Sequence, residues 1–406
     1  MRRAAFYLFI IAVFLAAPLL ALPRHAPAAP AATPTPTPAA TAAPAAPAAA
    51  APYRAVWVSY LEWQQTDFST ADTFAADAAE ICDNIRALGG TVVLAQVRPF
   101  GDALYPSAYF PFSHLCTGTQ GVDPGFDPLA ILVEAAHVRG LELEAWINPY
   151  RLQSGLVPAL CDDSPARQHP GWVKYTADGA YLDPASAEVR QYIADGVEEL
   201  CANYAVDGVH FDDYFYPTTA PDFDAADYAA SGTALSLDDW RRENVNALME
   251  LCHSVTRQHG VRFGAAPAGD PQQSYTLQYS DAARWLRQGT VDYLTPQLYW
   301  GQEYTKNGDA SHALARLAAT WAALPRAAGV QLYIGLGAYR VGAGDGSDTG
   351  SEWVSGHALA DQINLVERLG AQGVGLYRYA SLFGNFDYPQ LAESEADVIK
   401  NAWQVD

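Results

Sequence analysis

The chain has 406 residues, about half of them apolar, and its formal net charge is −21. This length and composition are enough for one large core or two ordinary ones. The excess of acidic side chains argues against binding to nucleic acid, because phosphates need Lys and Arg to displace their counterions, and against electrostatic docking on anionic lipid.

The N-terminal part of the chain is expected to lie outside the folded domain. Arg2 and Arg3 precede an apolar run that extends to about Leu22, a pattern typical of an export signal. The run is also close to the length that spans a bilayer, so residues 1–24 are predicted to be a signal peptide or a retained membrane anchor. Residues 25–52 are almost entirely Ala, Pro and Thr, and we expect a disordered spacer that carries an exported, extracellular or envelope-associated domain.

From residue 53 onward, short apolar runs alternate with amphipathic stretches. Strands are predicted at 54–60, 91–98, 141–148, 208–212, 261–266, 293–299, 331–337 and 373–379. Helical runs follow them, for example at 71–88, 128–139, 184–204, 237–259, 310–323 and 356–369. This alternation predicts an α/β fold, a (β/α)8 TIM barrel over residues 53–406 with long βα loops. A doubly wound open sheet would call for a Gly-rich phosphate turn after an early strand, and none is visible.

The active site of a TIM barrel lies at the C-terminal ends of its strands, so side chains that point inward there are candidates. Strand side chains alternate between two faces, which assigns the apolar positions to the helices and the polar ones to the interior. A purely structural interior would be filled mainly by Val, Ile and Leu. The predicted inward set is Gln96, Arg98, Glu144, Trp146, Asn148, His210, Asp212, Thr295, Gln297 and Tyr299.

The segment 208–217 reads GVHFDDYFYP and places Asp212 at the end of the fourth strand. Cleavage of a glycosidic bond uses two carboxyl groups, one to protonate the leaving oxygen and one to attack or to activate water. Asp212 suits the nucleophile or base. Asp213 can share the pocket only if the chain bends after Asp212, because neighbouring strand residues point to opposite sides. A turn or a helix cap is the alternative for the pair, and the aromatic run after it disfavours this.

Several other polar residues have a structural interpretation beside the functional one. Glu144 is expected to pair with Arg98 or His210, because a buried charge needs a partner. His210 either tunes Asp212 or fills the layer below it. Arg98 and Arg151 either orient sugar hydroxyls or anchor loops, and the position of Arg151 just after the third strand favours ligand contact.

Three further carboxylates lie in predicted loops. Asp270 and Glu303 follow the fifth and sixth strands and are alternative candidates for the second carboxylate. Asp183, which precedes Pro184, is predicted to cap a helix instead.

Aromatic residues are expected at the same face, where flat rings can stack on sugars, although about half of them should belong to the core. They are Tyr105, Tyr109, Tyr214, Tyr216, Tyr299, Trp300, Tyr339, Tyr377 and Tyr379.

None of the five cysteines forms a CxxC pair, so no zinc or redox motif, no metal ligand set and no cofactor is predicted. Cys116 and Cys161 lie in loops expected to share one face, and a disulfide between them would suit an exported protein.

Several long motifs occur in order: RAVWVSYLEW, VVLAQVRPFGDALYPS, DPLAILVEAAHVRGLELEAWINPYR, VDGVHFDDYFYP and DYLTPQLYW. Over residues 53–382 they resemble the bacterial glycosyl hydrolase-like 10 family of cell envelopes. The resemblance implies a TIM barrel and, for at least some members, cleavage of peptidoglycan glycan strands stripped of their peptides. It also implies that Asp212 and Asp213 fall on the motif FDDYFY. The other pocket-facing motif positions that it implies are Gln96, Arg98, Asn148, Arg151, Gln297 and Tyr299.

The leading hypothesis is an exported glycosidase, retaining or inverting, that acts on a polysaccharide. Asp212 and Asp213 are its predicted catalytic residues. The expected substrate contacts are Gln96, Arg98, Asn148, Arg151, His210, Tyr214, Gln297, Tyr299 and Trp300. The fourth strand also looks like that of chitinase-type barrels but lacks their Glu. A substrate-assisted mechanism would therefore take its acid from Asp213 or from a loop.

Two alternatives remain open at this point. One is a non-catalytic glycan-binding barrel at the cell surface. The other is a metal-dependent deacetylase with His210, Asp212 and Asp213 as ligands, although no second clustered His supports it.

Overall fold

The computed structural model describes residues 52–212, 215–348, 350 and 352–404. The predicted signal or anchor segment and all but the last residue of the spacer lie outside the described residues, as do Asp213 and Tyr214. Within the described part of the chain, no helix is long and apolar enough to cross a membrane.

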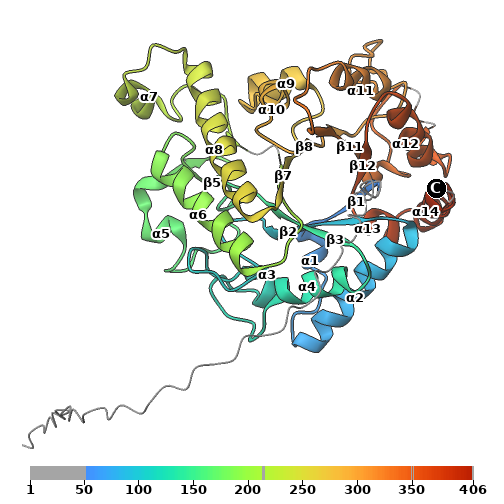
Figure 1. The fold of residues 1–406 in the computed structure, drawn as a ribbon, viewed down its shortest axis with the longest axis horizontal. Coiled ribbons are helices and arrows are strands. Elements are labelled where there is room, and N and C mark those ends of the chain that lie inside the picture. Colours follow the sequence, from blue (N-terminus) through green and yellow to red (C-terminus); the bar gives the residue numbers. More distant parts are fainter. Residues whose placement is uncertain (1–51, 213–214, 349, 351, 405–406) are drawn as a thin grey trace, which may run out of the picture. The chain divides into compact units, whose positions relative to one another are not determined.

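Within these residues, eight parallel strand positions form a closed barrel (Figure 1). Each pairs with the next around the ring, and the last pairs with the first, with Tyr53 opposite Gly373. The sixth and seventh positions are each built from two short strands. The first short strand of the sixth position pairs with the first of the seventh, and the second pairs with the second. In chain order the strands are β1 (Tyr53–Val58), β2 (Val92–Arg98), β3 (Glu142–Ile147), β6 (Gly208–Phe211), β7 (Arg262–Ala265), β8 (Tyr293–Leu294) with β9 (Gln297–Leu298), β10 (Gln331–Leu332) with β11 (Ile334–Gly337), and β12 (Gly373–Tyr377).

The break in the sixth strand falls at Pro296. Proline has no N–H to donate to the ladder, so the strand that the sequence predicted over 293–299 is interrupted there. The Pro296 carbonyl still accepts from the Gly335 N–H at 2.9 Å, which keeps the two strand positions together.

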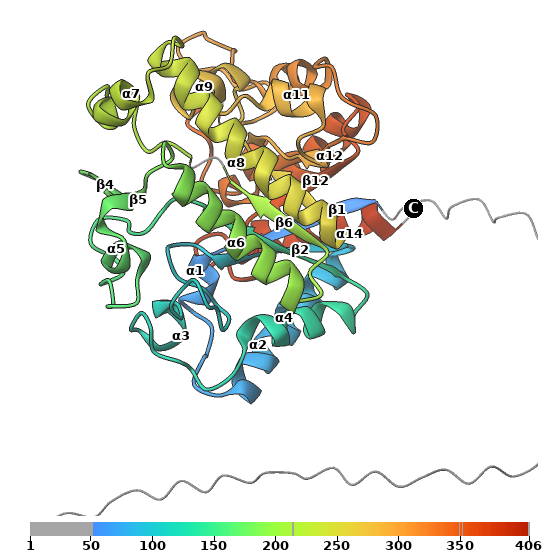
Figure 2. The same ribbon diagram turned by 60° about the vertical axis from the view of Figure 1, so that its left-hand side comes forward.

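A helical layer surrounds the sheet, and α6 and α8 run side by side on its outside (Figures 1 and 2). The main helices are α2 (Ala71–Leu88), α4 (Pro128–His137), α6 (Ala187–Asn203), α8 (Leu237–His259), α10 (Ala282–Gln288), α11 (Leu314–Ala322), α12 (Ala358–Arg368) and α14 (Pro389–Gln404). Short elements occupy the loops: α1 (Tyr60–Trp63), α3 (His114–Thr117), α5 (Pro165–Gln168), η1 (Pro170–Trp172), the hairpin β4 (Val173–Thr176) and β5 (Gly179–Leu182), α7 (Ala225–Ser231), α9 (Pro271–Leu277), η2 (Ala338–Arg340), η3 (Glu352–Val354) and α13 (Ala380–Phe383).

Capping residues explain where the predicted helix bounds hold and where they do not. Helix α8 has the predicted bounds because the Ser236 side chain accepts the Asp239 N–H and Gly260 ends the helix in a left-handed conformation. The predicted cap at Asp183 is wrong. Ser186 caps α6, whereas the Asp183 carboxylate accepts the Ala185 N–H at 2.9 Å before the helix begins.

The apolar residues form two cores, as strand alternation predicts. Val93, Leu143 and Phe211 face the helices in the large outer core. The barrel interior holds a smaller, largely aromatic cluster made of Tyr53, Ala55, Trp57, Val92, Leu94, Trp146, Ala266, Tyr293 and Tyr333. Polar side chains such as Glu144 and His210 bond to the tyrosine hydroxyls of this cluster.

Glu144 is buried in this interior, but its predicted partners are wrong. The Arg262 guanidinium donates to it at 2.8 Å, and the Tyr293 and Tyr53 hydroxyls donate to its Oε2. Burial raises the pKa of Glu144 to about 6, although Arg262 opposes the rise. Glu144 therefore belongs to the structure of the barrel and not to the candidate site.

The disulfide that the sequence allowed between Cys116 and Cys161 is not formed, because all five cysteines are free. Cys116 is buried in the outer core, whereas the Cys161 sulfur lies against Gly121, where an added Cβ would approach it to 3.0 Å. The two loops do share a region, but they place the two side chains in different surroundings.

Candidate active site at the barrel mouth

A cavity of about 280 Å³ lies at the C-terminal ends of the barrel strands. Its described lining residues come from seven of the eight strand positions or directly follow them, so the cavity is central to the barrel. They are Trp57, Trp146, Asp212, Ala266, Gln297, Tyr299, Tyr339 and Tyr377. Among these described residues, Asp212 is the only carboxylate. The prediction that places Asp212, Gln297 and Tyr299 around one pocket agrees with this geometry.

Asp212 is held from one side by two N–H donors. The Trp146 indole donates to its Oδ2 at 3.3 Å, and the Asn148 side-chain amide donates to the same oxygen. The carboxylate is only 5% exposed. N–H donors favour the ionised form of a carboxylate, so the arrangement suits a base or nucleophile that must be charged.

Behind Asn148 a second amide extends this arrangement into the barrel wall. The Gln96 amide nitrogen donates to the Asn148 Oδ1, and the Gln96 Oε1 accepts the Tyr60 N–H at 2.8 Å. Gln96 and Asn148 are each about 1% exposed. Both were predicted as substrate contacts, but burial places them behind Asp212, where they orient its carboxylate.

Aromatic rings form the walls of the cavity. Tyr299 stacks on Tyr377 with centroids 5.5 Å apart, and Tyr339 meets Tyr299 edge-on at 5.7 Å. Trp57 and Trp146 approach Tyr377 edge-on at 6.1 and 6.4 Å. Burial raises the pKa of the Tyr377 hydroxyl to about 12, so it stays protonated and can donate. Such a ring-lined hollow offers flat apolar faces and hydroxyl groups to a sugar.

Gln297 adds an amide to the aromatic wall. Its Nε2 donates to the Ala266 carbonyl at 2.9 Å, which fixes the side chain at the rim of the cavity. The side chain is partly exposed and lines the cavity, so it is placed to meet a ligand directly.

Arg98 does not point into the barrel, and this prediction is wrong. The register between β2 and β3 shifts between Gln96 and Arg98, so Arg98 pairs with Ile147 and takes the helix-facing side. Its guanidinium lies 4.0 Å over the Phe110 ring and against α6, where a Cβ on Gly196 would come within 2.7 Å of it. The bulge adds one residue and reverses the alternation on which the prediction depended.

His210 fills the layer below the cavity. It is fully buried, its Nδ1 pairs with the Tyr293 hydroxyl at 2.8 Å, and its ring meets Trp57 edge-on. Burial lowers the pKa of His210 to about 3, so the ring is neutral. It was predicted as a substrate contact, but it is fully buried and is not among the described lining residues of the cavity.

Arg151 and Trp300 lie outside the described lining of the cavity. Arg151 donates to the Pro99 carbonyl at 3.0 Å and lies 4.8 Å over Phe100, which ties the loop after β3 to the loop after β2. Trp300 packs its ring 4.9 Å from His312 and against the outer core. Their positions fit loop anchoring better than ligand contact.

The alternative second carboxylates do not line this cavity. Asp270 caps α9 by accepting the Gln272 N–H at 2.8 Å. Glu303 is exposed and lines a separate hollow beside Glu352. Asp213, the favoured partner, and Tyr214 lie outside the described residues.

The predicted aromatic residues divide as expected between site and core. Tyr299, Tyr339 and Tyr377 line the cavity, whereas Tyr105 and Tyr216 are buried in the outer core. Tyr379 accepts a hydrogen bond from Asn84 on α2, and Tyr109 lines a second cavity. Trp57 was missed, although alternation applied to the first strand would have placed it inside.

Comparisons with known proteins identify the family of the chain. The family model described as glycosyl hydrolase-like 10 matches residues 52–355. Glycosyl hydrolase YngK of Bacillus subtilis is 36% identical over 315 residues, covering 71% of this chain and 61% of its own length. Glycosyl hydrolase DigH of Escherichia coli K12 is 35% identical over 331 residues, covering 72% of this chain and 74% of its own length. The chain thus spans less than two thirds of YngK.

Solved structures show the same fold at low identity. The PgaB (BpsB) glycoside hydrolase domain from Bordetella bronchiseptica has a TM-score of 0.57 at 15% identity, covering 86% of this chain and 99% of that one. The catalytic domain of beta-amylase from Paenibacillus polymyxa has a TM-score of 0.52 at 13% identity, covering 81% and 93%. These likenesses confirm the predicted barrel, and the family matches support a glycosidase.

Proposed function

The chain belongs to the glycosyl hydrolase-like 10 family, and from that premise we propose that it hydrolyses O-glycosidic bonds of a polysaccharide. The observation that carries the proposal is the carboxylate of Asp212, held by two N–H donors inside a ring-lined cavity at the mouth of a TIM barrel. This is the position where TIM-barrel enzymes keep their catalytic groups.

In the proposed mechanism, Asp212 acts as the nucleophile or base. Asn148 and Trp146 hold its Oδ2 toward the cavity wall and stabilise its charge. Asp213 is proposed as the general acid that protonates the leaving oxygen, because it follows Asp212 directly and a glycosidase needs a second carboxyl group. Tyr214, on the same segment, is proposed to contact the ligand.

The remaining site residues divide by position. Gln297 and Tyr299 are proposed to contact sugar directly, with Trp57 and Tyr377 as additional ring surfaces. Gln96 positions Asn148 without touching the substrate.

The substrate proposed is a glycan of the cell envelope or outside the cell, such as peptidoglycan strands stripped of their peptides. Support comes from the resemblance of the motifs and from the apolar and Ala/Pro/Thr-rich segments at 1–24 and 25–52, which suit export and tethering. The folded enzyme would then comprise residues 53–406.

The test is release of new reducing ends from purified, peptide-stripped glycan strands. We expect the Asp212→Asn and Asp213→Asn variants each to lose more than about a hundredfold in kcat, the lower range for removal of an acid or base. Asp195→Asn, a half-buried residue of α6 outside the described cavity lining, is the matched control and should keep full activity. Full activity in the variant that carries both Asp212→Asn and Asp213→Asn would remove these residues from the mechanism.

A second candidate is a glycan-binding barrel without catalysis. It is favoured by one observation, that Asp212 is the only carboxylate among the described residues of the cavity lining. Binding to glycan strands with no turnover over a broad panel of polysaccharides would support it against the proposed hydrolase.

A further inference from the structure

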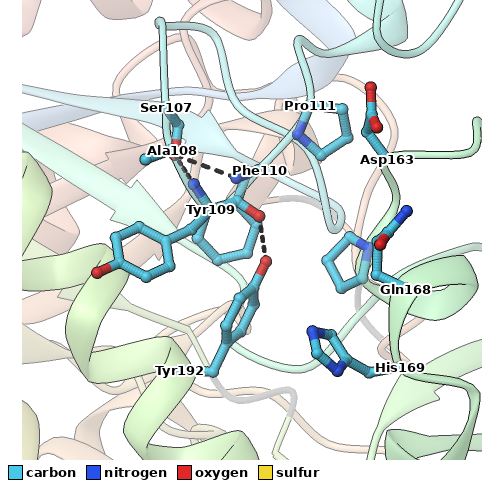
Figure 3. A pocket seen from close by; sticks show the side chains of 10 residues that line it. Ser107, Ala108, Tyr109, Phe110, Pro111, Asp163, Gln168, His169 and Tyr192 are labelled. Atoms are coloured by element: carbon cyan, nitrogen blue, oxygen red, sulfur yellow. Dashed lines mark hydrogen bonds between the residues drawn. The ribbon is translucent and has the colours of Figure 1, made fainter.

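A second, larger cavity of about 560 Å³ lies between the loops that follow β2 and β3. We propose that it is an outer subsite that binds one or two sugar units of the glycan chain whose cleaved bond lies at Asp212. This inference rests on the proposed function, since it assigns a further part of the same substrate. The described lining residues are Ser107, Ala108, Tyr109, Phe110, Pro111, Asp163, Pro165, Gln168, His169 and Tyr192 (Figure 3).

One wall of this outer subsite is fixed from behind by α6. The Glu199 carboxylate accepts the Ala108 N–H at 2.6 Å and the Ser107 hydroxyl at 2.5 Å. The Ser107 Oγ in turn accepts the N–H groups of Tyr109 and Phe110, both at 3.1 Å. A turn with this many hydrogen bonds holds the Phe110 ring in a defined position before any ligand arrives.

Tyr192 joins the same wall from the second turn of α6. Its hydroxyl donates to the Tyr109 carbonyl, and its ring lies 5.0 Å from that of Phe110. The Arg98 guanidinium covers Phe110 at 4.0 Å. The bulge that turns Arg98 away from the barrel thereby places it under the wall of the outer subsite.

The opposite wall carries His169. Its ring stacks on Trp172 with centroids 3.8 Å apart and an angle of 13°, and the Trp172 indole donates to Glu188 at 3.0 Å. Next to it, the Gln168 amide donates to the Asp162 carbonyl at 2.7 Å. In Figure 3, Phe110 and Tyr192 face His169, Gln168 and Asp163 across the cavity.

The chemistry of this lining fits a neutral sugar. The half-buried Tyr192 ring on one wall and the exposed His169 ring on the other can stack on the C–H faces of a pyranose. The Gln168 amide and the Asp163 carboxylate can bond its hydroxyl groups. Among the described lining residues there is no Lys or Arg, which disfavours a phosphate or a carboxylate ligand. The volume lies within the range of small-ligand sites.

This cavity lies at the same end of the barrel as Asp212. Its two loops leave the C-terminal ends of β2 and β3, the strand ends that also supply Gln96 and Asn148 behind Asp212. Tyr192 belongs to the N-terminal part of α6, which starts at the same end of the barrel. Both cavities therefore belong to one end of the fold, as a single glycan chain requires.

The test measures binding separately from cleavage. Peptide-stripped glycan strands are titrated calorimetrically into the full-length Asp212→Asn variant, with and without His169→Ala. We expect His169→Ala to raise Kd about three- to tenfold, the usual contribution of one aromatic contact. The matched control is His357→Ala, which removes an exposed histidine next to α12 and should leave Kd unchanged. Gln168→Ala is the second variant should His169→Ala fold poorly.

The outcomes distinguish this inference from the proposed function. An unchanged Kd in both His169→Ala and Gln168→Ala, or an equal rise in His357→Ala, overturns the outer subsite even if the wild-type protein cleaves the strands. A selective rise in Kd supports it. The same rise in a protein that cleaves no glycan would refute the proposed hydrolase and leave the subsite in place.

Discussion

Removing the Asn148 side chain should weaken catalysis by Asp212 without changing the described lining residues of the cavity. In Asn148→Ala, the Asp212 Oδ2 loses the amide N–H of Asn148 and keeps the indole N–H of Trp146 at 3.3 Å. A hydrogen bond to a charged group contributes about 1.5–3 kcal/mol, which corresponds to about a 10- to 150-fold loss in kcat/KM. Because Asn148 is buried behind the carboxylate, we expect the loss in kcat with little change in KM.

Gln96 provides the internal control for this reasoning, because it reaches Asp212 only through Asn148. Gln96→Leu removes a bond between neutral groups and should cost about two- to tenfold in kcat/KM. The double variant should be no worse than Asn148→Ala alone, since both act through one contact. Gln191→Ala, at an exposed position on α6, controls for unspecific effects.

The assay is the initial rate of reducing-end release over a range of glycan concentrations, with thermal melting of each variant to confirm folding. If the two losses in kcat/KM multiply in the double variant, Gln96 does not act on Asp212 through Asn148. A rise in KM at constant kcat for Asn148→Ala would mean that Asn148 binds sugar, which contradicts its burial behind Asp212.

Further substitutions test individual features. Arg98→Met should leave kcat unchanged because Arg98 faces α6 and not Asp212, and a lowered kcat would show that Arg98 points into the barrel. Gln297→Ala should raise KM about two- to tenfold through loss of a rim amide. Arg241→Met breaks a fully buried pair with Asp224 and should lower the free energy of unfolding in urea by about 3–5 kcal/mol. Adding Asp224→Leu should recover part of this loss, and no recovery would contradict its attribution to an unpaired Asp224 carboxylate. Burial lowers the pKa of His210 from 6.5 to about 3, so its contribution to stability is complete above pH 6.5 and is lost as the pH falls toward 3. The difference in unfolding free energy between wild type and His210→Gln should therefore shrink by about 1.4 kcal/mol per pH unit below that point, and a difference independent of pH would contradict a buried neutral ring.

The sequence by itself determined the architecture and the end of the barrel at which the candidate site lies. Strand alternation placed Asp212, Asn148 and Gln297 on the inner side, because the direction of a strand side chain follows from its neighbours in the chain. Capping residues determined the bounds of α2 and α8 for the same local reason.

Only the tertiary structure decided which groups meet. The β2 bulge turned Arg98 from the barrel interior to the helical layer, because a register shift depends on the neighbouring strand. Glu144 pairs with Arg262, which lies 118 positions away in the chain, and not with the expected partners. The pairing of Asn148 with Asp212 likewise joins two strand ends, so its presence depends on barrel closure and could not be predicted from either segment alone.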